Sequence, residues 1–106
     1  MYNYFYIKTD CLSNTWDTAE IMRFLRQYDI FTERPQGIFF SQTPFISLSL
    51  MKVKNIHSWS SNDFDPGGTN YISIITTETS NDQPLIKEFL KDVEKFLGYR
   101  ICQDET

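Results

Sequence analysis

The chain is poor in the residues that most often carry catalysis or bind metals. Its 106 residues include one histidine, His57, and two cysteines, Cys11 and Cys102. A single histidine excludes sites built on two histidine ligands and leaves one candidate base for a Ser–His or Cys–His pair. The two cysteines match no zinc-binding spacing. We therefore predict no metal site, no cofactor and no catalytic residue, and we expect that the protein is not an enzyme.

Long apolar runs are also missing. A helix that spans a membrane needs about 18 or more consecutive apolar residues, and the sequence contains no such run. The segment MYNYFYIKTD lacks the basic start and apolar core of a secretory signal. These features predict a cytoplasmic protein whose two thiols are reduced. Whether Cys11 and Cys102 pair is left open by the sequence.

Positive charge is scarce and dispersed. Ten lysines and arginines face fourteen aspartates and glutamates, which gives a formal net charge of −4. Proteins that bind nucleic acid usually carry a clustered positive surface, so the charge argues against that class. Mild acidity suits a partner with a basic face, although it is also common among soluble proteins in general.

Aromatic residues and β-branched residues are abundant, and one stretch organises the chain. Residues 71–77 form a β-branched run that predicts a strand. Residues 85–97 predict a helix, with Pro84 in its first turn, Asn81 or Asp82 as its cap and Gly98 as its stop. The apolar stripe of this helix recurs at helical spacing and comprises Leu85, Ile86, Phe89, Leu90, Val93, Phe96 and Leu97. Residues 99–102 predict a short final strand.

The first half of the chain predicts a helix and three further strands. Residues 2–7 indicate a strand whose Phe5 and Ile7 face the helices. Residues 18–28 predict a helix that Asp17 caps. Residues 38–41 and 45–53 predict an antiparallel hairpin.

Alternation in the 45–53 strand assigns its two faces. Ile46, Leu48 and Leu50 point to one side, and Ser47 and Ser49 point to the other. The serine side is therefore expected to be exposed or covered by something small.

Together these elements predict a single α+β domain over residues 1–106. We expect a mostly antiparallel sheet of about five strands, with two helices packed on one face, in the order β-α-β-β-β-α-β. The helix before the last strand permits one parallel pair. The alternatives are that the last strand pairs at an edge elsewhere or is not a strand.

Residues 55–70 form the longest stretch without periodicity, NIHSWSSNDFDPGGTN. Long irregular segments in small domains are often functional, because loops carry binding residues on a rigid scaffold. The predicted partner-binding residues all lie in this segment and are His57, Trp59, Asp63, Phe64 and Asp65. The alternatives are that residues 56–60 prolong a strand and that the aromatic residues fold onto the core while the aspartates only solubilise a turn.

The acidic turn of this segment resembles the start of a calcium-binding loop, but the match fails. The fifth ligand position holds Gly67, and the twelfth, where a bidentate glutamate is needed, holds Ile74. Asp63 and Asp65 could also act as a general acid and base, but no third group supports that role.

The last third of the chain resembles a protein family. YISIITTETS, the helix PLIKEFLKDVEKFLGYRI and the acidic ending Gln103-Asp104-Glu105-Thr106 resemble the small, acidic immunity proteins of bacterial polymorphic toxin systems, including contact-dependent growth inhibition. The resemblance is structural and transfers no site residues. It implies a cytoplasmic protein that binds and neutralises one toxin domain, expected to be a nuclease, without doing chemistry itself.

Three hypotheses for the function follow. The first is this immunity protein, a monomer or weak dimer whose partner is its cognate toxin domain and neither nucleic acid nor a membrane. The second is a small enzyme or ligand-binding protein with a cleft near His57, Asp63 and Asp65, with Tyr71 as a further member. The third is a structural or regulatory subunit that self-associates through the serine side of residues 45–53.

Overall fold

The computed structural model describes residues 2–55 and 63–103. Two sequence-predicted site residues, His57 and Trp59, and the acidic ending after Gln103 lie outside the described residues, as does the suggested strand extension over residues 56–60. The elements, in chain order, are β1 (Tyr2–Lys8), α1 (Thr18–Leu25), β2 (Thr32–Arg34), β3 (Ile38–Gln42), β4 (Phe45–Met51), β5 (Tyr71–Thr77), α2 (Glu78–Asn81), α3 (Pro84–Leu97) and β6 (Cys102–Gln103).

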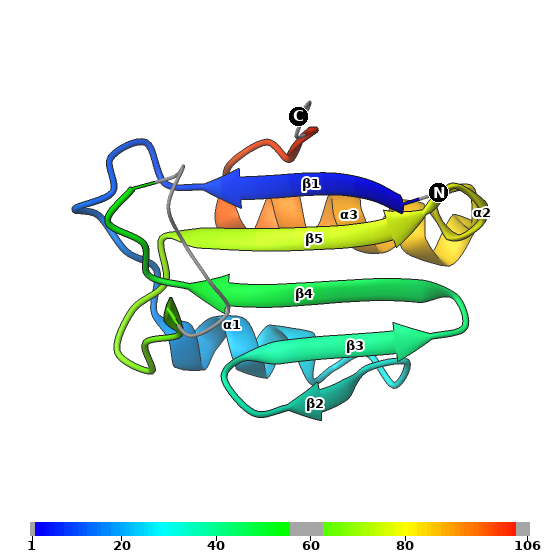
Figure 1. Ribbon diagram of the computed structural model, residues 1–106, viewed down its shortest axis with the longest axis horizontal. Coiled ribbons are helices and arrows are strands. Elements are labelled where there is room, and N and C mark those ends of the chain that lie inside the picture. Colours follow the sequence, from blue (N-terminus) through cyan, green and yellow to red (C-terminus); the bar gives the residue numbers. More distant parts are fainter. Residues whose placement is uncertain (1, 56–62, 104–106) are drawn as a thin grey trace.

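These strands form one sheet in the order β2-β3-β4-β5-β1-β6, and every neighbouring pair is antiparallel. Figure 1 shows α1 and α3 on the same side of this sheet. The predicted α+β class, with helices packed on a mostly antiparallel sheet, is confirmed. The suggested parallel pair is wrong, because β6 pairs antiparallel with β1 and lies at the edge of the sheet.

The sheet has six strands rather than about five, because the sequence predicts no strand between the first helix and residue 38, where β2 lies. Its three residues, Thr32–Arg34, are all exposed, so burial imposes no apolar alternation that the sequence could display. A tight turn through Gln36 and Gly37, at φ 67° and 69°, brings β2 back along β3. Short polar edge strands of this kind hinder pairing with other chains.

The first helix begins as predicted and ends earlier. The Asp17 carboxylate accepts from the Ala19 N–H at 2.9 Å and caps α1. After Leu25 the backbone tightens, since the Gln27 N–H donates to the Phe24 carbonyl and the Tyr28 N–H donates to the Leu25 carbonyl. These three-residue hydrogen bonds mark a final 3₁₀-type turn, which explains why helical spacing extends to Tyr28.

The cap predicted for α3 is wrong. Asn81 belongs to α2, which a reciprocal pair of bonds between Thr77 and Ser80 caps, and Gln83 precedes α3 without a side-chain cap. Pro84 is the first residue of α3, where its missing N–H costs no helical bond. Gly98 ends the helix at φ 77°, as the sequence predicts.

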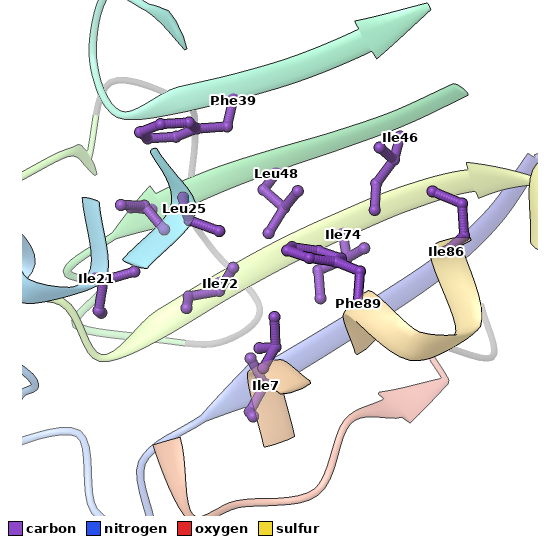
Figure 2. Close-up of a cluster of buried hydrophobic side chains, with 12 residues drawn as sticks. Ile7, Ile21, Leu25, Phe39, Ile46, Leu48, Ile72, Ile74, Ile86 and Phe89 are labelled. Atoms are coloured by element: carbon purple, nitrogen blue, oxygen red, sulfur yellow. The ribbon is translucent and has the colours of Figure 1, made fainter. Parts of the chain in front are cut away.

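The main core lies between the sheet and the two longer helices, as Figure 2 shows. Ile7 is fully buried there and Phe5 packs against it, as expected from the alternation of β1. Buried residues of β3, β4 and β5 meet Ile21 and Leu25 of α1 and Ile86, Phe89 and Val93 of α3. Both α1 and α3 pack on this face of the sheet, so neither of them covers the opposite face.

Candidate functional site

The predicted loop returns to the sheet at Asp63. The Lys52 N–H, just beyond β4, donates to the Asp63 carbonyl at 2.9 Å. The half-buried Phe64 packs against the main core, and its ring lies over Gly37, where an added Cβ would be 2.5 Å from the ring. Phe64 therefore has a packing role, and the alternative in which this aromatic side chain folds onto the core describes it correctly.

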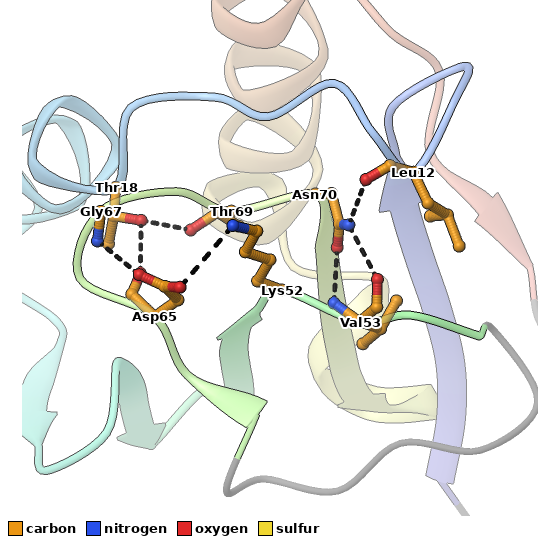
Figure 3. A network of polar contacts seen from close by, with 8 residues as sticks. All are labelled: Leu12, Thr18, Lys52, Val53, Asp65, Gly67, Thr69 and Asn70. Atoms are coloured by element: carbon orange, nitrogen blue, oxygen red, sulfur yellow. Dashed lines mark hydrogen bonds and ion pairs between the residues drawn. The ribbon is translucent and has the colours of Figure 1, made fainter.

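Asp65 organises the turn that follows, as Figure 3 shows. Its Oδ1 accepts from the Gly67 N–H at 2.7 Å, and its Oδ2 lies 3.8 Å from the Lys52 Nζ. Its carbonyl accepts from the Thr18 hydroxyl at 2.8 Å. Because that bond uses the only Thr18 hydroxyl proton, Thr69 donates the 2.7 Å bond between the two hydroxyls. The aspartate thus ties the turn to the start of α1, while its side chain stays 43% exposed.

Asn70 locks a second loop in place. Its fully buried amide accepts from the Val53 N–H at 2.8 Å and donates to the carbonyls of Val53 and Leu12, both at 2.9 Å. These bonds join the end of β4 to the loop between β1 and α1 (Figure 3). A buried amide with three partners has a structural role and leaves little capacity for a ligand.

A hollow of about 450 Å³ lies beside this network, and its lining includes Lys52, Lys54, Asp65 and Asn70. In it the structure brings together Asp65 and two lysines. Of the other residues in the enzyme hypothesis, Tyr71 is buried against Met51 and Val53, and His57 is outside the described ranges. No group of three or more metal-binding side chains occurs in residues 2–55 and 63–103.

The feature that sequence reasoning missed is the face of the sheet opposite the helices. Because cross-strand partners share a face, the strand registers define its members. We call this surface the open sheet face. Its described residues are Tyr2, Tyr4, Tyr6 and Lys8 of β1, Thr32 and Arg34 of β2, Ile38, Phe40 and Gln42 of β3, Phe45, Ser47, Ser49 and Met51 of β4, Tyr71, Ser73, Ile75 and Thr77 of β5, and Cys102 of β6.

Aromatic side chains dominate this face and touch one another across strands. Tyr2 and Phe45 have ring centroids 5.4 Å apart, and Phe40 lies edge-on to Phe45 at 5.7 Å. Tyr2 and Tyr4 are 53% and 47% exposed. Exposed aromatic residues that gather on one surface often mark an interaction site, whereas isolated ones need no explanation.

Small side chains occupy the middle of the open sheet face. Ser47 and Ser49 are two residues apart on β4, and Ser73 of β5 pairs directly with Ser49. Their pairing partners on the adjoining strands, Tyr6, Ile38, Phe40 and Ile75, are larger. Neither α1 nor α3 covers the serine side that the 45–53 alternation predicts. Because the serine side chains are shorter than their aromatic and aliphatic neighbours, they form the lower part of the surface.

Charge is distributed unevenly between the two sides of the sheet. Among the described residues of the open sheet face, the charged side chains are Lys8 and Arg34, both cationic. The Arg34 guanidinium lies 4.3 Å from the centroid of the Phe40 ring. The described acidic residues lie on helices and loops or, in the case of Glu33, on the helix side of β2, where it forms a bidentate pair with Arg26.

One end of the open sheet face is covered. Met51, Val53 and Tyr71 form a small buried cluster, against which Leu12 and Tyr6 pack. Tyr6 and Tyr71 stack with centroids 5.7 Å apart. The part of the face that α1, α3 and this cluster leave uncovered extends toward Tyr2 and Phe45 at the other end of the strands.

The shifted pKa values of Tyr28, Glu33 and Cys11 belong to groups outside the open sheet face. Burial, helped by donation to Asp92, raises the pKa of the Tyr28 hydroxyl in the helix layer to about 12. The hydrogen bond from Arg26 lowers the pKa of Glu33. Hydrogen bonding to Ser13 lowers the pKa of the exposed Cys11 thiol, and both cysteines are free.

Part of this face could have been found from the sequence. Tyr2, Tyr4 and Tyr6 alternate with Asn3, Phe5 and Ile7, so the period of a strand places the three tyrosines together. The partners that they gain from other strands depend on strand order, which local patterns do not specify. Irregular segments carry visible binding signals in a sequence, whereas a surface assembled from several strands does not, so the sequence points to the 55–70 loop.

The chain was also compared with known proteins. Comparison with protein-family models, with curated protein sequences and with solved structures finds no match. None of the helices in residues 2–55 and 63–103 is long and apolar enough to cross a membrane.

Proposed function

We propose that the protein is an immunity protein that binds one bacterial toxin domain in the cytoplasm and blocks its active site or the access of its substrate. The proposal begins from the resemblance of the last third of the chain to immunity proteins. The observation that carries it is the open sheet face, a broad aromatic surface on which neither α1 nor α3 packs. The tyrosines, phenylalanines and arginine of this face are residue types enriched at protein–protein interfaces, and acidic residues, which are depleted there, are absent from its described residues.

Neutralisation by binding needs no catalytic group in the protein. A rigid sheet that presents preformed side chains loses little conformational entropy when it docks, so more of the contact energy appears as affinity. Blocking requires only that the bound protein occupy space which the toxin's substrate must enter. The predicted contact residues of the 55–70 segment, His57, Trp59, Asp63, Phe64 and Asp65, remain part of this proposal as a second contact region.

Capture followed by a growth assay tests the proposal. Tagged protein is incubated with lysate of the source cells at moderate salt, and the bound fraction is identified by mass spectrometry. We expect one stoichiometric partner, the C-terminal domain of a large secreted protein. Expression of that domain should arrest bacterial growth, and co-expression of the protein should restore it. Equal arrest with and without the protein would show that the proposed function is wrong.

The loop needs a test of its own that leaves the fold intact. Phe64 and Asp65 hold packing and turn contacts, so their substitution would mix folding with binding. The double variant His57→Ala and Trp59→Ala leaves Phe64 and Asp65 unchanged, and its melting temperature measures whether the fold is kept. Weaker toxin binding by this variant would support the loop as a contact region, and unchanged affinity would remove these two residues from the proposed contacts.

Self-association is the second candidate function, and the same face favours it. Ser47 and Ser49 lie on the open sheet face, where a second copy could pack sheet against sheet. Sedimentation over a wide concentration range separates the two candidates. A monomer at all concentrations would exclude the self-association hypothesis.

A further inference from the structure

We infer that the open sheet face is the docking surface for the toxin domain, and that the matching surface of the toxin has an apolar centre and carboxylates at its rim. This inference rests on the proposed function and specifies the chemistry of the partner. It differs from the expectation that the net negative charge suits a partner with a basic face, because the open sheet face supplies no carboxylate among its described residues.

The two cations of the open sheet face indicate which charge the rim of the partner's surface should carry. Lys8 and Arg34 lie on strands that are separated by β3, β4 and β5, so they are roughly 19 Å apart at the usual strand spacing. A partner carboxylate near either cation gains attraction, whereas a basic surface would be repelled. A phosphate-binding cleft of a nuclease is basic and is therefore not the surface that meets this face.

The position of the Arg34 side chain favours binding of a partner carboxylate. Its guanidinium stacks on the Phe40 ring at 4.3 Å, so its planar donor group is already oriented before a partner binds. An ordered arginine loses less rotamer freedom when it forms a bidentate bond to a carboxylate. Arg34 is exposed on the edge strand β2, where a rim contact is geometrically accessible.

The centre of the face determines the apolar part of the partner. Ser47, Ser49 and Ser73 lie low between larger side chains, so a protruding partner side chain can fill the space above them. Their hydroxyls can donate to or accept from a polar end of that side chain. The strands range from two residues in β6 to seven in β1, β4 and β5, which gives the whole sheet, its covered end included, an area of roughly 500 Å². Each partner of a standard interface contributes about 800 Å², so further contacts around the sheet are needed to complete one.

A second copy of the chain fits this face less well than a separate protein. In a two-fold dimer the same surface is present on both sides, so the Lys8 and Arg34 of each copy would face a surface without carboxylates. Single-stranded nucleic acid also uses aromatic platforms, but it needs a positively charged groove along its backbone. The two cations of the open sheet face, on a chain with a net charge of −4, do not form such a positively charged groove.

Matched pairs of variants test the inference with the captured toxin domain as the probe. Arg34→Glu changes the open sheet face, and Arg23→Glu makes the same charge change on the exposed side of α1. Tyr4→Ala removes a 47% exposed aromatic side chain from the face, and Phe96→Ala removes a 45% exposed one from α3. Equal melting temperatures within each pair would exclude loss of folding as the cause of a difference.

We expect Tyr4→Ala, which removes an aromatic contact, and Arg34→Glu, which turns attraction to a rim carboxylate into repulsion, each to weaken toxin binding by about tenfold or more. The two control variants should bind within about threefold of wild type. If the two variants of each pair change toxin affinity equally, the open sheet face is not the docking surface. The proposed function would still stand in that case. The proposed function itself fails if the wild-type protein neither binds the domain nor protects cells, and the docking inference fails with it.

The other occupants are separate outcomes of the same set of measurements. Concentration-dependent dimerisation that Tyr4→Ala and Arg34→Glu abolish would assign the face to a second copy and overturn the inference. Binding of a single-stranded oligonucleotide such as oligo(dT) that Arg34→Glu abolishes would do the same. A carboxylate→Lys change on the toxin that restores binding to Arg34→Glu would confirm the carboxylate rim directly.

Discussion

At the scale of single residues, two glycines with left-handed backbones distinguish the cost of backbone strain from the cost of a steric clash. Gly37 has φ +69° and lies under the Phe64 ring, whereas Gly98 has φ +77° and no neighbouring atom within 4 Å of an added Cβ. A side chain at either position meets the cost of positive φ, about 1–2 kcal/mol. The position under Phe64 adds overpacking, typically about 1–3 kcal/mol.

We therefore predict that Gly37→Ala lowers the free energy of unfolding by about 2–5 kcal/mol and that Gly98→Ala lowers it by about 1–2 kcal/mol. Urea denaturation of both variants measures the difference. In a Phe64→Ala background the cost of Gly37→Ala should fall toward that of Gly98→Ala, because the clashing ring is absent and the remaining close neighbour is the Leu50 Cβ at 3.3 Å. An unchanged cost in that background would contradict the contact between Gly37 and Phe64.

The hydroxyl of Tyr28 makes stability depend on pH at alkaline values. Its pKa is raised from 10.0 to about 12, so the folded state retains this proton where the unfolded state has lost it. The contribution is therefore complete below pH 10 and is lost as pH rises toward 12. We predict that the free energy of unfolding of wild type falls between pH 10 and pH 12 relative to that of Tyr28→Phe, which has no hydroxyl to ionise.

Absorbance at 295 nm follows tyrosine ionisation and provides an independent check. Subtracting the titration of Tyr28→Phe from that of wild type should leave one transition near pH 12. A transition near pH 10 would show that burial and the 2.9 Å bond to Asp92 do not hold the proton.

At the scale of elements, α3 has two phenylalanines that test its packing. Phe89 is 1% exposed in the core, and Phe96 is 45% exposed and stacks on Phe24 with centroids 4.4 Å apart. We predict that Phe89→Ala lowers the free energy of unfolding by about 3–5 kcal/mol, through lost burial and a residual cavity. Phe96→Ala should cost about 1 kcal/mol, the scale of one aromatic pair. Similar costs for the two variants, measured by chemical denaturation, would contradict the orientation of α3.

Elements with a periodic apolar pattern could be predicted from the sequence. The Ile46, Leu48 and Leu50 alternation of β4 is a direct consequence of burial on one side, and the structure confirms it. The stripe of α3 is confirmed in part, because Ile86, Phe89 and Val93 are buried. Its members Leu85 and Phe96 are 46% and 45% exposed, so the apolar stripe is wider than the buried face of the helix. The strand β2 could not be predicted in this way, because its three exposed residues bury nothing. Strand order and the antiparallel direction of β6 depend on contacts between distant segments, which no local pattern encodes.

At the scale of the whole molecule, the sheet separates two unlike surfaces. The helix side carries the core, and the acidic residues of α1 and α3 face outward from it. The open sheet face carries exposed tyrosines and two cations among its described residues. Net charge could be read from the sequence, but this two-sided distribution depends on the fold, so the sequence alone directed attention to an acidic loop.

The tyrosines provide the most direct test of the central claim, because they report on both sides of the sheet. Tyr2, Tyr4 and Tyr6 lie on the open sheet face, whereas Tyr28 and Tyr99 pack on the helix side against Phe89 and Trp16. Fluorine NMR of 3-fluorotyrosine-labelled protein, assigned by single Tyr→Phe variants and titrated with the captured toxin domain, resolves the two groups. The account predicts that the signals of Tyr2, Tyr4 and Tyr6 shift or broaden while those of Tyr28 and Tyr99 do not. Shifts confined to Tyr28 and Tyr99 would place the partner on the helix side and contradict the account.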